Sequence, residues 1–260
     1  VLLSSFDTDG FTLGNNNTTN QSGYQTVAWC WDAGTGSAVS NTDGSITSSV
    51  KASTDYGFSI VSWTGNATTG ATVGHGLSSQ PEFVIIKNRD ATTNWDVHID
   101  ADGDNTNNIR LQLDTTDDDF DNARCGLSST TLTLENSVRM NGSGNGMIAY
   151  CFHSVSGYSK IGSYTGTGAS GNATTGLGFK PAFLLVKDIT SVHNWWIWDS
   201  TREPQNPKND ALVPNVTAVE QTPLPVDFDA DGFTIDTTNG EMNQSGNTYI
   251  YMAFADKREA

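Results

Sequence analysis

The stretch YSKIGSYTGTGASGNATTGLGFKP at residues 158–181 has a second, similar copy in this chain. About 100 residues earlier, residues 57–81 read GFSIVSWTGNATTGATVGHGLSSQP. In both copies a strand-like run leads into a Thr–Gly turn, and a second Gly-rich turn leads to a proline. An internal repeat shapes the whole architecture, so it sets the frame for every other pattern in the sequence.

The match continues beyond the quoted phrase at the same spacing. Further pairs are Pro81 and Pro181, Lys87 and Lys187, Trp95 and Trp195, and Leu132-Thr133-Leu134 with Phe233-Thr234-Ile235. We therefore predict two units of about 100 residues, which cover 57–156 and 157–260.

The start of the chain resembles the second half of such a unit. Two motifs recur near its end: DGFT at 9–12 and 231–234, and NQSG at 20–23 and 243–246. Residues 1–31 are thus predicted to be a partial repeat, covered by an upstream unit, by unit 57–156 or by a neighbouring subunit in strand-complementation style. Residues 32–56 match neither unit and are predicted to be a linker with one strand.

The repeated unit is written in strands. EFVIIK and AFLLVK are short apolar runs, while NWWIWD and YIYMAFA are rich in the aromatic and β-branched residues that favour strands. Gly-rich turns recur every ten residues or so, and no long segment has 3.6-residue apolar spacing. The fold class is therefore predicted to be all-β, with two tandem jelly-roll-like antiparallel β-sandwiches.

Alternation along one strand separates its two faces. Trp95, Val97 and Ile99 fall on one face, which we interpret as inward, and Asp96 and His98 fall on the other.

In the second unit, Trp196 and Trp198 occupy the positions of Asp96 and His98. Two outward indoles need a partner. We expect either a cover from this protein or its oligomer, or a sugar stacked on Trp196 and Trp198 as candidate ligand-binding residues.

Acidic clusters raise the question of calcium. Asp100, Asp102 and Asp104 bring like charges together, and a cation would relieve their repulsion, so they are the candidate metal ligands. A solvated acidic loop is the alternative. The Asp-x-Asp-Gly motifs at Asp7 and Asp229 lack the Glu that closes an EF-hand loop, and we interpret them as tight turns.

The three cysteines are predicted to be free small packing residues. Cys30, Cys125 and Cys151 form no CxxC spacing, and Cys30 and Cys151 share a repeat position with Ala253.

Nothing in the sequence predicts catalysis. The four histidines have no ligand spacing, and no GxSxG, P-loop or dinucleotide motif occurs. We therefore expect a protein that is not an enzyme and has no catalytic residues.

The charge and hydropathy pattern excludes some partners. With 13 basic and 29 acidic residues, the formal net charge of −16 repels nucleic acid and anionic membranes. No stretch is long and apolar enough to span a bilayer. No signal-peptide pattern opens the chain, so none is expected.

The phrases VAWCWDAG (27–34), AVSNTDGSITSSV (38–50) and TYIYMAFA (248–255), with the repeated phrase quoted above, carry a resemblance. They are similar to a repeat in tail-fibre and other virion proteins of marine bacteriophages, where it often lies beside laminin-G-like or concanavalin-A-like lectin modules. The resemblance brings no catalytic residues, and no cofactor is expected apart from calcium at the acidic cluster.

The resemblance implies a structural and adhesive module of a phage tail fibre or related virion appendage, in the virion or outside the cell. Its expected partners are copies of itself, other virion proteins and host-surface glycans. Two alternatives stay open: a carbohydrate-binding module without catalysis that uses Trp196 and Trp198, and a subunit of a self-assembling extracellular filament.

Overall fold

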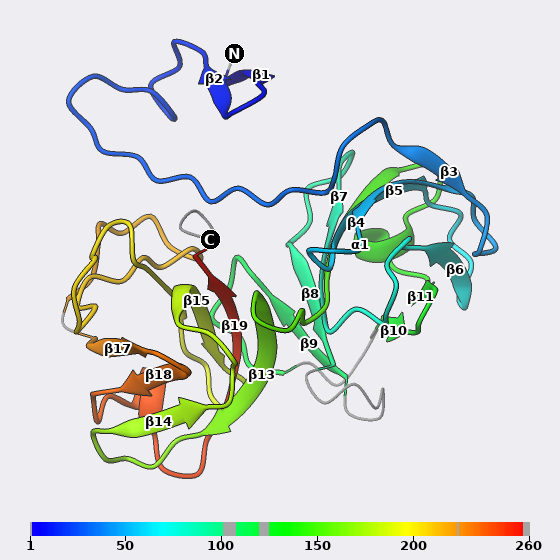
Figure 1. The fold of residues 1–260 in the computed structure, drawn as a ribbon. Helices are drawn as coiled ribbons and strands as arrows, with labels where there is room; N and C mark the ends of the chain where they lie inside the picture. The colour runs from blue at the N-terminus through cyan, green and yellow to red at the C-terminus, as the bar shows by residue number, and fades with distance from the viewer. Residues whose placement is uncertain (1, 101–107, 120–124, 223, 257–260) are drawn as a thin grey trace. The chain divides into compact units, whose positions relative to one another are not determined.

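The computed structural model describes residues 2–100, 108–119, 125–222 and 224–256. The chain divides into two compact units, Val1–Trp31 and Asp32–Ala260. Nearly all regular structure in the described residues is antiparallel β-sheet, so the all-β prediction is confirmed (Figure 1).

The first sandwich packs a seven-stranded sheet on a three-stranded sheet. The seven strands lie in the order β3 (Val39–Asn41), β4 (Ser48–Ser53), β5 (Phe58–Thr64), β12 (Gly146–Phe152), β7 (Phe83–Asn88), β8 (Asp96–Ile99) and β9 (Ile109–Gln112). The three strands are β10 (Gly126–Leu127), β11 (Thr131–Leu134) and β6 (Ala71–Gly74). Val61 and Val84 of the large sheet meet Val73 and Leu132 of the small sheet in a solvent-free core.

The segment 32–56, predicted to be a linker with one strand, contributes two strands. β3 and β4 pair with each other, and β4 pairs with β5, so this segment widens the large sheet of the first sandwich.

The second sandwich has a four-stranded and a three-stranded sheet. The larger has the order β13 (Ser159–Thr165), β19 (Thr248–Ala255), β15 (Pro181–Asp188) and β16 (Trp195–Asp199). The smaller has the order β14 (Asn172–Thr175), β18 (Gly232–Ile235) and β17 (Val226–Asp229). Leu184 and Val186 pack with Phe228 and Phe233 in its core.

One turn of helix precedes the last strand of each sandwich. These helices are α1 (Val138–Asn141) and α2 (Gly240–Asn243). Ser137 and Asn239 cap them by accepting hydrogen bonds from backbone N–H groups, as short polar side chains do at helix starts. In the part of the chain that the structure describes, no helix has the length and apolar character to cross a membrane.

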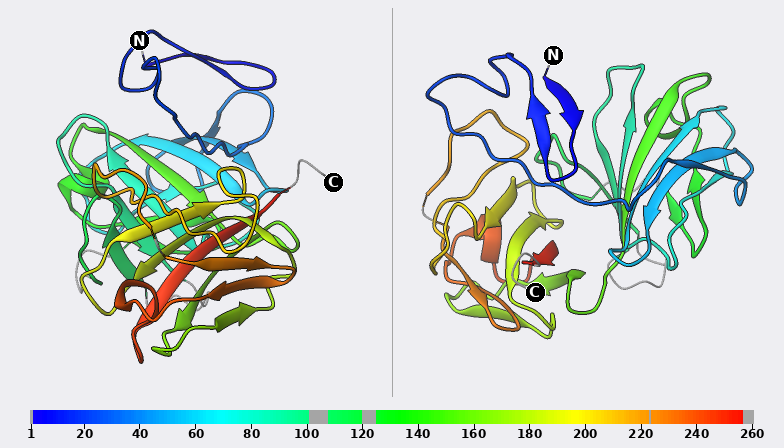
Figure 2. Two further views of the ribbon diagram at one scale, coloured as in Figure 1. Left: turned by 90° about the vertical axis from the view of Figure 1, so that its left-hand side faces the viewer. Right: turned by 45° about the horizontal axis from the view of Figure 1, so that its top comes forward.

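The two sandwiches share one strand order. β5-β12-β7-β8 in the first corresponds to β13-β19-β15-β16 in the second, and β6-β11-β10 corresponds to β14-β18-β17. Figure 2 shows the same strands from two further directions. The register agrees as well, because Met147 lies opposite Trp63 and Asn88, whereas Tyr249 lies opposite Tyr164 and Asp188. The repeat itself stays a prediction from the sequence.

The outer faces of the two large sheets pack against each other. Phe83 of β7 and Trp195 of β16 meet edge to face, with ring centroids 6.5 Å apart. Phe152 of β12 and Phe254 of β19 meet in the same way at 6.1 Å. Aromatic burial of this kind carries much of the energy of an interface.

This packing reverses the predicted faces of β8. Ile99 lies opposite Phe83 and therefore faces the other sandwich. His98 faces the core of its own sandwich, where its Nδ1 accepts a hydrogen bond from the backbone N–H of Cys125 at 3.1 Å. The sequence interpretation of inward Val97 and Ile99 was wrong because both faces of β8 are buried, so alternation alone cannot tell the core from the junction.

The unit Val1–Trp31 holds a small hairpin of β1 (Leu3–Phe6) and β2 (Phe11–Leu13). The carboxylate of Asp7 accepts hydrogen bonds from Ser5 at 2.8 Å and Thr12 at 2.7 Å, which is the predicted tight turn. Residues 25–31 form no strand, although their sequence predicts one. The corresponding strands β12 and β19 each pair with two neighbours, and the described part of this unit has no counterpart of those neighbours.

Candidate functional site

The predicted ligand-binding tryptophans lie in the core of the second sandwich. Trp196 is 6% exposed and Trp198 is 0% exposed. Their rings stack with centroids 6.4 Å apart and an interplanar angle of 30°. The chain itself covers them, as one of the two sequence hypotheses expected, and neither offers a ring face for a sugar.

The segment between β16 and β17 supplies this cover. Ala211, Val213 and Leu224 belong to the same core cluster as both indoles. The indole N–H of Trp198 donates to the carbonyl of Leu224 at 3.2 Å. The covering segment therefore satisfies the polar edge of the ring as well as its apolar face.

Of the three predicted calcium ligands, the structure describes only Asp100. Asp100 is buried, and its carboxylate accepts a hydrogen bond from Gln80. Asp102 and Asp104 lie outside the described residues. The described residues contain no group of three or more His, Cys, Asp or Glu side chains placed to hold a metal ion. Calcium at this loop stays a prediction.

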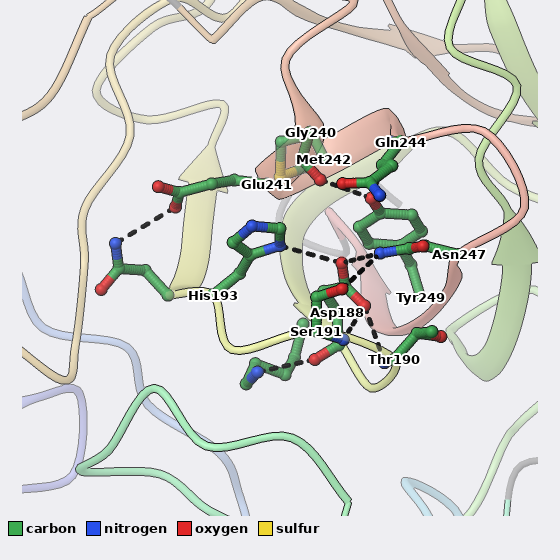
Figure 3. Close-up of polar contacts among 12 residues, drawn as sticks. Asp188, Thr190, Ser191, His193, Gly240, Glu241, Met242, Gln244, Asn247 and Tyr249 are labelled. Atoms are coloured by element: carbon green, nitrogen blue, oxygen red, sulfur yellow. Dashed lines mark hydrogen bonds and ion pairs between the residues drawn. The ribbon is translucent and has the colours of Figure 1, made fainter.

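A polar cluster of the second sandwich surrounds Asp188, and sequence reasoning missed it (Figure 3). Asp188 ends β15 and is fully buried. Its Oδ1 accepts backbone N–H bonds from Thr190 at 2.8 Å and Ser191 at 3.1 Å, which forms the turn toward β16. Its Oδ2 accepts from His193 Nδ1 at 2.9 Å and from Asn247 at 2.7 Å.

A second carboxylate lies on the adjoining helix α2. Glu241 Oε2 accepts from the indole N–H of Trp196 at 3.0 Å and from Asn194 at 3.1 Å. Tyr249 fastens the same helix, because its hydroxyl donates to the carbonyl of Gly240 at 2.6 Å and accepts from the N–H of Gln244 at 2.8 Å. Burial raises the pKa of Tyr249 well above its ordinary value, so this hydroxyl keeps its proton.

The Asp188 cluster fastens segments to one another and does not assemble a nucleophile. Ser191 Oγ receives its hydrogen bond from Asn247 at 3.0 Å, while His193 is bonded to Asp188. A catalytic triad would instead join the serine hydroxyl to the histidine. The contacts tie the β15–β16 turn to the start of β19.

The first sandwich has the same pattern of hydrogen bonds around a neutral residue. Asn88, at the position of Asp188, accepts from the N–H groups of Asp90 at 2.9 Å and Ala91 at 3.0 Å, and from Asn145 at 3.2 Å. The turn is therefore made without the charge. The residue missed from sequence had a signal: a short polar residue, Asn88 or Asp188, at the end of each strand, where a side-chain acceptor closes a turn.

Lys187, beside Asp188, is buried at the junction of the sandwiches. Its Nζ donates to the carbonyl of Asp188 at 2.6 Å and to that of Thr116 at 3.3 Å. Desolvation by burial lowers the pKa of Lys187 to about 8, against the pull of nearby carboxylates. The neighbouring Trp195 indole donates to the carbonyl of Gln112 at 2.9 Å. The hydrogen bonds from Lys187 to Thr116 and from Trp195 to Gln112 join the two sandwiches directly.

Comparison with known proteins adds a family. No curated protein and no solved structure matches the chain. One family model covers residues 1–258, and thus both sandwiches and the hairpin unit. The chain belongs to the DUF7483 family, a domain of unknown function.

Proposed function

We propose that the protein is a structural and adhesive module of a phage tail fibre or related virion appendage. The observation that carries the proposal is the buried junction between the two sandwiches. Phe83 packs on Trp195, Phe152 packs on Phe254, and the Trp195 indole is hydrogen bonded across the junction. Domains joined by a polar interface move relative to one another, whereas a large apolar junction resists such motion.

A resistant junction suits a protein that transmits force between a particle and a surface. The resemblance of the repeated phrase to virion repeats supports the same role, and the family model spans the whole junction. The sandwich edges and loops are then the parts that meet a partner, because sandwiches present their variable loops at the ends of rigid sheets.

The proposal is tested on particles of the phage that encodes the chain. Virions are purified on a density gradient, and their proteins are identified by mass spectrometry. Peptides of this chain should follow the major capsid protein at a constant ratio through the particle peak. Peptides found only in the soluble fraction would contradict the proposal.

A further inference from the structure

The outer face of the seven-stranded sheet changes character across its width. Beside the second sandwich it is apolar and covered, as at Phe83 and Ile99. On β3, β4 and β5 it carries a row of hydroxyls, because Ser40 lies opposite Ser49, and Ser49 lies opposite Ser62. Directly opposed residues on neighbouring strands lie about 5 Å apart.

This row lies in a groove of about 460 Å³ at one end of the sheet. Most of the residues that line it carry hydroxyls: Ser40, Thr47, Ser48, Ser49, Ser62 and Thr64. Ser48 donates to the carbonyl of Gly74 at 2.9 Å. The other five hydroxyls make no side-chain hydrogen bond to any described residue, so they are available to a polyhydroxylated ligand.

Of the described residues that line the groove, Arg89 is the one that carries a charge. It is exposed, and its backbone N–H donates to the carbonyl of Gly146 at 2.9 Å, which fixes its place beside β12. Within the described part of the chain its guanidinium has neither an ion pair nor a hydrogen bond, in a protein with 29 acidic residues. A guanidinium in this state is suited to a carboxylate, which it binds with two parallel N–H bonds.

Gly146 lies between the hydroxyls and the arginine, and its N–H donates to the carboxylate of Asp90 at 2.6 Å. It lies opposite Thr64 on one side and is bonded to Arg89 on the other. In the second sandwich Thr248 holds the place of Gly146, opposite Thr165, and Ile189 holds that of Arg89. Among its described residues, the second sandwich also has no counterparts of β3 and β4. The groove is therefore a feature of the first sandwich.

We propose that this groove binds an acidic saccharide, with Arg89 on its carboxylate and the hydroxyls of β4 and β5 on its hydroxyl groups. The proposal rests on the adhesive function proposed above and names the ligand class and the residues for it. The chain's net charge of −16 repels an acidic ligand in general, and the guanidinium of Arg89 offsets this repulsion at the groove.

Isothermal titration calorimetry of the full chain tests the proposal with trigalacturonate as the probe. Its methyl ester keeps the hydroxyls and removes the charge, and inorganic sulfate supplies an anion without hydroxyls. We expect saturable binding of trigalacturonate, at least tenfold weaker binding of the ester, and weaker binding of sulfate. Arg89→Gln and Gly146→Thr should each lower the affinity for trigalacturonate at least tenfold. The first variant removes the charged hydrogen-bonded contact, and the second blocks it.

Two matched variants control for general effects. Ser163→Val changes the residue at the position of Ser62 in the second sandwich, and Arg139→Gln removes an arginine outside the groove. Both should bind trigalacturonate as the parent does, whereas Ser62→Val should bind several-fold more weakly. Circular dichroism and melting curves show which variants remain folded.

Failure to bind trigalacturonate, equal affinity for the ester or for sulfate, or parent-like binding by Arg89→Gln overturns the proposal. Detection of the chain in purified virions is independent of these outcomes. A groove that does not bind therefore leaves the appendage proposal standing, and a chain absent from virions leaves the binding result intact.

Discussion

Phe83 and Trp195 come from different sandwiches and meet edge to face with ring centroids 6.5 Å apart. Both are 0% exposed, although each lies on the outer face of its own sheet. In the first sandwich Trp95, at the position of Trp195, is 37% exposed. The same residue type therefore has different surroundings in the two units, and only one of the two indoles is part of the junction.

Trp195→Ala should weaken the junction strongly. It removes a buried ring and the hydrogen bond to Gln112, and large-to-small changes of this kind cost about 3–5 kcal/mol. Trp95→Ala is the matched control and should cost less, since Trp95 is 37% exposed and therefore loses less buried area. Urea unfolding measures both. Equal losses would contradict the assigned junction.

Asp188→Asn should be milder than Asp188→Ala. Asparagine keeps an acceptor for the two N–H groups of the turn, as Asn88 does in the first sandwich. Alanine leaves buried donors unsatisfied, including that of Asn247, at a cost of about 3 kcal/mol or more. Free energies of unfolding from urea titrations should separate the two variants. Equal losses of stability in Asp188→Asn and Asp188→Ala would contradict the role of the side-chain acceptor in the turn.

Lys187 should make stability depend on alkaline pH. Burial lowers the pKa of its ammonium to about 8, from an ordinary value of 10.5. Between these values the unfolded chain binds more protons than the folded chain, so the free energy of unfolding rises with pH through this window.

Lys187→Met removes this contribution of the lysine to the pH dependence of the free energy of unfolding. The stability of the variant relative to the parent should therefore fall between pH 7 and pH 10.5, by up to about 3 kcal/mol. Urea titrations of both proteins across this range provide the measurement. A stability difference that does not change with pH would show that the ammonium is not desolvated.

Thiol accessibility should separate the cysteines. Cys125 and Cys151 are fully buried, and burial raises the pKa of Cys151 to about 12 and that of Cys125 further still. The thiolate is the reactive form, so both should resist a thiol reagent in the native protein while Cys30 reacts. Denaturation without reductant should expose all three. Fewer than three thiols in denaturant would indicate a disulfide.

Strand composition was a reliable guide to fold class. Runs such as AFLLVK and YIYMAFA became the paired strands β15 and β19, because their residues fit a sheet that is buried on both faces. Because both faces of the sheet are buried, the sequence did not reveal which face of β16 points to the core. Trp195 and Trp196 point to opposite faces and are both buried, so no alternation of polar and apolar residues marks the core side.

The polar sites depend on contacts between distant strands. Asp188 meets Asn247 from another strand's loop, and Arg89 adjoins Gly146 only because β7 pairs with β12. Sequence spacing does not reveal such neighbours. The repeat did contain part of the signal, since Arg89 and Gly146 stand where the second unit has Ile189 and Thr248.

The adhesive role is tested most directly by competition for the host surface. Host cells are incubated with increasing amounts of the purified chain, then mixed with the phage to which the proposed function assigns it, and the rate of virion adsorption is measured. Serum albumin at equal concentration serves as the control. We expect the adsorption rate to fall in a saturable manner with the chain and to stay constant with albumin. An adsorption rate that the chain leaves unchanged at every concentration would contradict an adhesive role.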